Sequence, residues 1–65
     1  MSDEEEADAA LLKAVVAGYI EGVERLLANA SMAGLRAALE KAEPGSAIAV
    51  LLRKEIKRRA PTFKP

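Results

Sequence analysis

Apolar side chains recur at three- and four-residue spacing along almost the whole of this 65-residue chain. About fifty residues fit this spacing, which is typical of helices that bury one face. No segment shows the alternation of apolar and polar residues that a half-buried strand requires. The predicted fold class is therefore all-α: three to four short antiparallel helices that form a small helical bundle or paired αα-hairpins.

Three positions are expected to separate the helices. Gly18 interrupts the first apolar stripe and is suited to a left-handed helix end. Ser31 is a favourable N-cap for the next helix. The Glu-Pro-Gly-Ser sequence at 43–46 is the clearest turn, and its serine caps the last helix. Whether residues 4–29 form one helix or two stays open, because a helix can also continue through a single glycine.

The length of the chain limits it to one domain. Residues 1–60 are assigned to a single helical domain, which includes an acidic N-terminal head at residues 2–8. Residues 61–65 form a C-terminal tail. Ser2 or Asp3 is expected to cap the first helix, and Pro61 is expected to end the last.

The apolar stripes also identify the residues that should form the core. Fourteen of the 65 residues are alanine, which buries little area, so a core of this size is marginal on its own. The absence of cysteine and histidine excludes a disulfide and an ordinary zinc site as added support. Self-association or docking on a larger protein partner remains. The expected core and interface residues are Leu11, Leu12, Val15, Ile20, Val23, Leu26, Leu27, Leu35, Leu39, Ile48, Leu51, Leu52 and Ile56.

A helix, a glycine and a second helix follow one another in residues 10–30. The positions that carry this pattern are Leu11, Ala14, Gly18, Ile20, Glu21, Val23, Leu26 and Leu27. The segment resembles one helical hairpin of the ankyrin-repeat family. The resemblance implies antiparallel hairpins and a protein-binding role. The chain departs from that family because Leu11 and Leu35 are 24 residues apart, where the family repeats at about 33, and because the Thr-Pro-Leu-His opening and the long hairpin loop are missing.

Charge is strongly polarised, although the chain has no net charge. Residues 1–8 contain five acids and no base, and residues 53–65 contain six bases and one acid. Such ends can complement helix dipoles, and a basic end can also bind phosphate groups. Four helices would bring both charged ends to one end of the bundle, whereas three would leave the basic patch free. The candidate phosphate-binding residues are Arg53, Lys54, Lys57, Arg58 and Arg59.

Sequence-specific recognition of nucleic acid is disfavoured, but phosphate contact is left open. Tyr19 and Phe63 are the only aromatic residues that could stack on bases. The last helix begins with Ala-Ile-Ala-Val-Leu-Leu, where a recognition helix presents polar residues to base edges.

No catalytic, cofactor-binding or metal-binding residue is assigned. General acid–base catalysis most often uses histidine, which the chain lacks. The acidic residues at 3–8 lack the loop spacing of a calcium site and are interpreted as a solvated head. We therefore expect no enzyme activity, no cofactor and no small-molecule substrate. The longest wholly apolar run, residues 47–52, is too short to cross a bilayer, and the acidic N-terminus does not resemble a signal peptide. A cytoplasmic protein without membrane association is expected.

The sequence thus favours a non-catalytic protein–protein interaction or assembly module that self-associates or joins a larger protein partner. The alternative is a helical protein that binds nucleic acid through the basic end of its last helix.

Overall fold

The computed structural model describes the backbone of residues 3–60 and the side chains of residues 5–60. The predictions for Ser2, for Pro61 and for the tail at 61–65 lie outside the described residues. Four helices make up the fold: α1 (Asp3–Ala17), α2 (Ile20–Leu26), α3 (Met32–Lys41) and α4 (Ala47–Arg59). Residues 3–60 contain no strand, so the predicted all-α class is confirmed.

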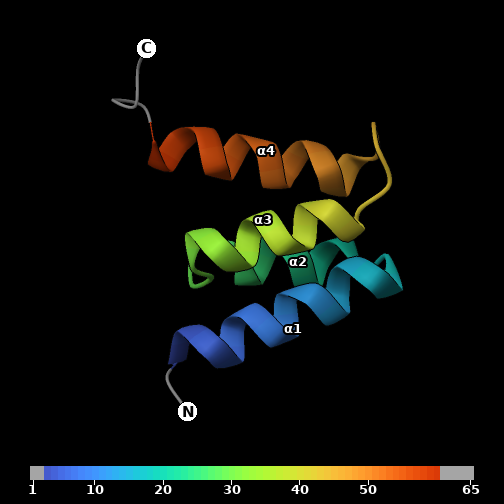
Figure 1. Ribbon diagram of the computed structural model, residues 1–65. Coiled ribbons are helices and arrows are strands. Elements are labelled where there is room, and N and C mark those ends of the chain that lie inside the picture. The colour runs from blue at the N-terminus through green and yellow to red at the C-terminus, as the bar shows by residue number, and fades with distance from the viewer. Residues whose placement is uncertain (1–2, 61–65) are drawn as a thin grey trace.

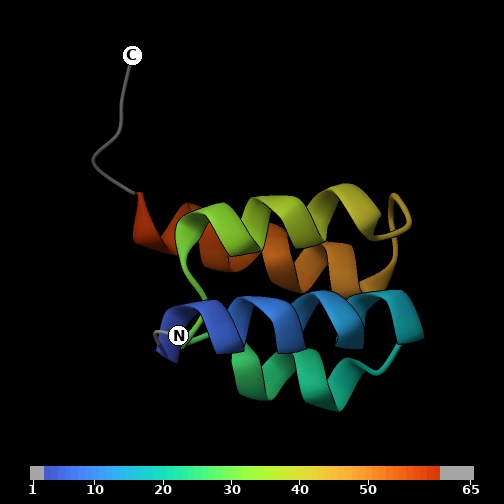
Figure 2. The ribbon, with the colours of Figure 1, turned by 60° about the horizontal axis from the view of Figure 1, so that its bottom comes forward.

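The helices form two stacked hairpins. α1 and α2 make the first antiparallel hairpin and α3 and α4 the second, with α1 packed beside α3 and α2 beside α4 (Figure 1, Figure 2). α1 and α4 lie at opposite edges of the molecule (Figure 1). The first residues of α1 and the last residues of α4 lie at the same end of the bundle, as expected for four helices.

Gly18 ends α1 in the predicted left-handed conformation, with a φ of +74°. The Tyr19 N–H donates to the Ala14 carbonyl at 2.9 Å, and the Gly18 N–H donates to the Val15 carbonyl at 3.1 Å. These two bonds satisfy carbonyl groups at the end of the helix in a Schellman arrangement. Residues 3–26 therefore form two helices and not one.

Serine caps begin the two helices of the second hairpin, as predicted. The Ser31 hydroxyl accepts a hydrogen bond from the Gly34 N–H at 3.0 Å. The Ser46 hydroxyl accepts one from the Ala49 N–H at 3.2 Å. Each serine satisfies a backbone donor that has no partner within its helix.

The core lies between the two hairpins. Leu11, Val23, Leu35 and Leu52 are fully buried, and each comes from a different helix. Among the other expected core residues, Val15 and Ile48 are buried. Half-buried positions are Leu12, Leu26, Leu27, Leu39, Leu51 and Ile56.

Ile20 differs from the expected core placement, because 38% of it is exposed. It is the first residue of α2, so it has no preceding turn of its helix to cover it. The core also uses small residues that are absent from the expected core residues. These buried alanines are Ala7, Ala14, Ala30, Ala38 and Ala49. Small side chains let the helix backbones approach closely.

Asp8 joins α1 to the N-terminus of α3. Its Oδ1 atom accepts a hydrogen bond from the Ser31 N–H at 2.8 Å, and its Oδ2 atom accepts one from the Ser31 hydroxyl at 2.6 Å. A carboxylate at this position is also favoured by the dipole of α3. Asp8 therefore differs from the solvated acid that the sequence suggested: it is half-buried and links the two hairpins.

Gly34 leaves the space that the Asp8 carboxylate occupies. A Cβ atom added at Gly34 would overlap the carboxylate carbon and oxygens of Asp8. In an ordinary helix, replacing glycine by alanine stabilises by about 1 kcal/mol. Because of the close contact with Asp8, the same substitution at Gly34 should destabilise the protein.

We predict that Gly34→Ala lowers the free energy of unfolding by about 1–3 kcal/mol, because it displaces a carboxylate that accepts two hydrogen bonds. In an Asp8→Ala background the same change should raise that free energy by up to about 1 kcal/mol. Urea unfolding of the four variants, followed by circular dichroism, measures both effects. If Gly34→Ala changed the free energy of unfolding in the same direction in both backgrounds, the contact between Gly34 and Asp8 would be contradicted.

Candidate functional site

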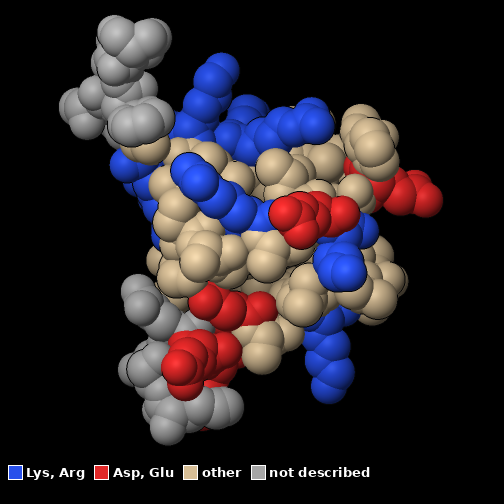
Figure 3. Space-filling model, in the orientation of Figure 1, with Lys and Arg blue, Asp and Glu red and all other residues tan. Residues whose placement is uncertain are grey.

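Most of the basic residues of α4 lie along its outward face. Ile48 and Leu52 bury the opposite side of this helix. Arg53, Lys54 and Lys57 are exposed. In the space-filling view, Lys and Arg side chains gather over α4 along the upper edge of the molecule (Figure 3). The structure therefore brings the candidate phosphate-binding residues onto one helix.

Arg58 forms an ion pair on the surface of α4. Its Nη2 and Nε atoms donate to the two carboxylate oxygens of Glu55, at 2.6 and 3.2 Å. Hydrogen bonds from Arg58 and from Arg59 lower the pKa of Glu55 to about 2. The hydrogen bond with Glu55 also raises the pKa of Arg58. Much of the Arg58 charge is therefore balanced within its own helix, although 68% of its side chain is exposed.

Arg59 is tied to the loop between α2 and α3. Its Nη2 atom donates to the Leu27 carbonyl at 2.6 Å and to the Ala28 carbonyl at 3.3 Å. Its Nη1 atom donates to the Ala30 carbonyl at 2.5 Å, and its Nε atom donates to Glu55 at 2.8 Å. Only 22% of the side chain is exposed. A phosphate contact by Arg59 would have to compete with these internal acceptors.

The other three bases keep their charge available. The side chains of Arg53, Lys54 and Lys57 make no hydrogen bond or ion pair with another residue in the described part of the chain. They form the unpaired section of the basic face. Of the five candidates, three therefore have unpaired side chains, Arg58 forms a surface ion pair with Glu55, and Arg59 is hydrogen-bonded to the α2–α3 loop.

An apolar groove of about 410 Å³ runs between α1 and α2. No residue of α3 or α4 lines it, so it opens away from the second hairpin. Tyr19, which is 54% exposed, forms part of its wall. Among the described lining residues Lys13 alone is charged. The lining consists of Ala10, Lys13, Ala14, Ala17, Tyr19, Gly22 and Leu26.

Sequence reasoning missed the groove because small residues form its floor. Ala10, Ala14 and Ala17 lie at helical spacing along α1, but alanine gives a weak apolar signal. Gly22 provides the space for the Tyr19 ring, since a Cβ atom at Gly22 would lie 2.6 Å from Tyr19 Cδ2. The alanine spacing was the one signal in the sequence that pointed to this surface.

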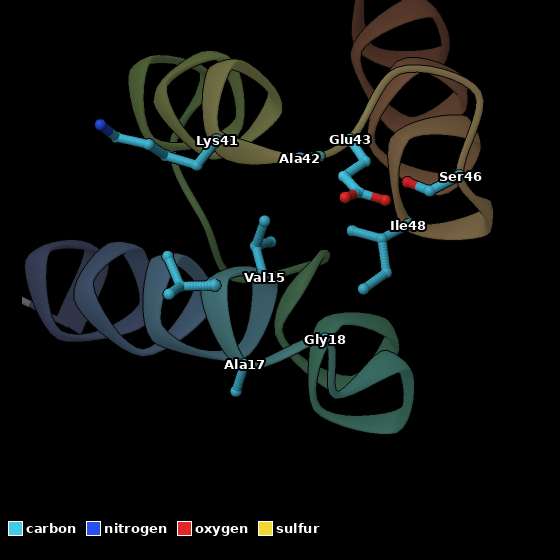
Figure 4. Close-up of a pocket in the computed structure, with 9 residues that line it drawn as sticks. Val15, Ala17, Gly18, Lys41, Ala42, Glu43, Ser46 and Ile48 are labelled. Atoms are coloured by element: carbon cyan, nitrogen blue, oxygen red, sulfur yellow. The ribbon is translucent and has the colours of Figure 1, made fainter.

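A second hollow, of about 570 Å³, lies where α1 ends and α4 begins. Val15 and Ile48 project into it, whereas Lys41 extends away from it (Figure 4). Val16 lines it with 69% of its surface exposed. The Ser46 hydroxyl at this hollow caps α4, and no lining residue is a histidine that could activate it.

The described residues were also searched for metal sites and membrane-spanning helices. Among them, no three acidic side chains are placed to hold a metal ion. None of their helices has the length and apolar character needed to cross a membrane. Comparisons with protein-family models, curated proteins and solved structures find no match. The two surfaces on α4 and on the first hairpin are therefore the candidates for function.

We predict that Arg59→Ala lowers the free energy of unfolding by about 1–3 kcal/mol, because carbonyl groups at the end of α2 lose a charged donor. Arg53→Ala is the matched control, since Arg53 is exposed and unpaired, and it should change that free energy by less than about 0.5 kcal/mol. Urea unfolding compares the two variants. Equal effects would show that the bonds to the α2–α3 loop contribute nothing specific.

Proposed function

We propose that this chain is a non-catalytic assembly module that binds protein and associates with copies of itself. The observation that carries the proposal is the apolar groove between α1 and α2. A monomer gains nothing by leaving such a surface open to water, and exposed apolar patches commonly mark sites of interaction. The groove belongs to the first hairpin alone, and no residue of α3 or α4 fills it.

The size of the core supports the same proposal. Each helix contributes one fully buried Leu or Val side chain, and much of the remaining core is alanine. Burial of apolar area contributes about 25 cal/mol per Å², so alanine contacts add little to stability. Covering the groove with another protein surface would add apolar burial that a single chain lacks.

Analytical ultracentrifugation over a wide concentration range tests self-association. We expect the weight-average mass to rise above the 6.9 kDa of one chain as the concentration increases. Ala10→Arg should reduce this rise because it places a long charged side chain in the groove. Ala9→Arg adds the same side chain at an exposed position outside the groove and should leave the rise unchanged. A mass of 6.9 kDa at every concentration would contradict the proposal.

Nucleic-acid binding is a second candidate function, which the three unpaired bases of α4 favour. Arg53, Lys54 and Lys57 are exposed on one helix, where they can approach a phosphate backbone. Neutralising three phosphates predicts a slope of about −2.7 when the logarithm of the binding constant is plotted against the logarithm of salt concentration. Such binding would be weak and largely independent of sequence.

Titration of a labelled duplex DNA at low salt tests this candidate. Reversing both Lys54 and Lys57 to Glu should abolish binding, because it removes two of the three phosphate contacts and adds repulsion. Reversing Arg36 and Lys41 to Glu changes the net charge by the same amount on α3 and should weaken binding far less. Equal losses in the two double variants, or no binding by the unchanged protein, would reject α4 as a phosphate site.

A further inference from the structure

We propose that the hollow where α1 ends and α4 begins binds a small aliphatic amine, as a ligand and not a substrate. The ammonium group lies against the Glu43 carboxylate, and the hydrocarbon chain covers the apolar floor. The hollow has a volume of about 570 Å³, within the range of about 300–1,000 Å³ that is usual for small-molecule sites. Among the described lining residues it shares only Ala17 with the groove between α1 and α2, so amine binding does not depend on the proposed self-association.

The floor of the hollow is apolar. The side chains of Val15 and Ile48 project into it from α1 and α4 (Figure 4). Val16, Ala17 and Ala42 also line it, and 69% of Val16 is exposed. An alkyl chain that covers this surface removes apolar area from water, which contributes about 25 cal/mol per Å².

One carboxylate borders this floor. Glu43 is the only acid among the described lining residues, and its side chain extends toward Ile48 (Figure 4). That side chain makes no hydrogen bond or ion pair within the described part of the chain. Lys41, the only base in the same lining, extends away from the hollow (Figure 4). The carboxylate is therefore available to a cation from outside the chain.

Two helix C-termini add negative potential at the same place. α1 ends at Ala17 and α3 ends at Lys41, and both residues line the hollow. No backbone N–H of the described residues donates to the carbonyl of Ala17 or of Lys41. Each helix C-terminus carries about half a negative charge, and α1 has no basic residue in its last turn to offset it. The N-terminus of α4 has the opposite sign, but it is one helix end against two C-termini and a carboxylate.

This arrangement favours a ligand with one positive charge on an apolar body. A second ammonium at the far end of the chain would meet Val15 and Val16, and leaving water without a polar partner is costly. A carboxylate in place of the ammonium would face Glu43 and the two helix C-termini, which repel it. The expected order of affinity is therefore n-hexylamine, then hexamethylenediamine, then hexanoate.

Titration of the isotope-labelled protein with these three compounds at low salt, followed by amide chemical shifts, measures this order. We expect saturable shifts with n-hexylamine, centred on the end of α1 and on the turn between α3 and α4. The dissociation constant should be in the millimolar range, as is usual for a ligand of so few atoms.

Glu43→Gln should weaken n-hexylamine binding by about two- to fivefold, the range that an exposed ion pair supplies. It should also reduce the preference for the amine over hexanoate. The matched control is Glu40→Gln, which neutralises an exposed acid of α3 outside the hollow and should leave the affinity unchanged.

A second pair of variants tests the apolar floor. Val16→Lys places a positive charge where the hydrocarbon chain lies, and should weaken n-hexylamine binding more than about tenfold. Ala9→Lys adds the same side chain at an exposed position of α1 outside the hollow and should have little effect. Circular dichroism checks that all four variants retain their helices.

Three results would overturn amine binding at this hollow. They are shifts with n-hexylamine that do not saturate, hexanoate binding as tight as that of the amine, and equal affinities in the Glu43→Gln and Glu40→Gln variants. Self-association is measured separately by the mass of the protein without amine, so failure of either result leaves the other standing.

Discussion

The loop between α2 and α3 is held by side chains from the two ends of the fold, and the stacking of the hairpins depends on it. Arg59, the last residue of α4, donates to three carbonyls of this loop. Asp8, in the first half of α1, accepts from the N–H and hydroxyl of Ser31. The loop joins the end of one helix to the start of another, where backbone groups have no intrahelical partners. The Arg59 guanidinium satisfies carbonyl groups that follow α2, and the Asp8 carboxylate satisfies the Ser31 N–H at the start of α3.

α2 shows why this junction matters. It has only seven residues, far fewer than an isolated helix needs in water. Val23 anchors it in the core, and Arg59 binds the carbonyls that follow its last turn. With α2 fixed in this way, the far side of the first hairpin keeps its groove and α4 keeps its outward face. Arg59 is thereby withdrawn from the surface, and Arg58 is paired with Glu55, which leaves Arg53, Lys54 and Lys57 as the unpaired bases among the described residues of α4.

Local sequence signals predicted the helices and their ends. Gly18, Ser31 and Ser46 each act within a few residues of their own position, so their roles can be read from neighbouring residues. The sequence left open whether residues 4–29 form one helix or two, and the left-handed conformation of Gly18 in the structure divides them. The end of α2 at Leu26 was not predicted, because the contact that holds the following loop comes from Arg59 on α4.

The contacts of Asp8 and Arg59 were harder to predict, because they join residues far apart in the chain. Asp8 lies 23 positions from Ser31, and Arg59 lies 29 positions from Ala30. Both looked like members of solvated charge runs, and only the packing of the hairpins gives them partners. The groove was missed for a different reason: alanine contributes so little apolar area that its spacing along α1 does not distinguish a groove from an ordinary solvent-facing row.

The most direct test of this account is the thermodynamic coupling between Asp8 and Arg59, measured by urea unfolding of Asp8→Ala, Arg59→Ala and the double variant. The two side chains share no direct hydrogen bond, but they hold the same loop. We predict that the double variant loses less stability than the sum of the single variants, by more than about 0.5 kcal/mol, because either change alone already loosens the loop. Additive losses within that margin would show that the two ties act independently, and would contradict the role assigned to the junction.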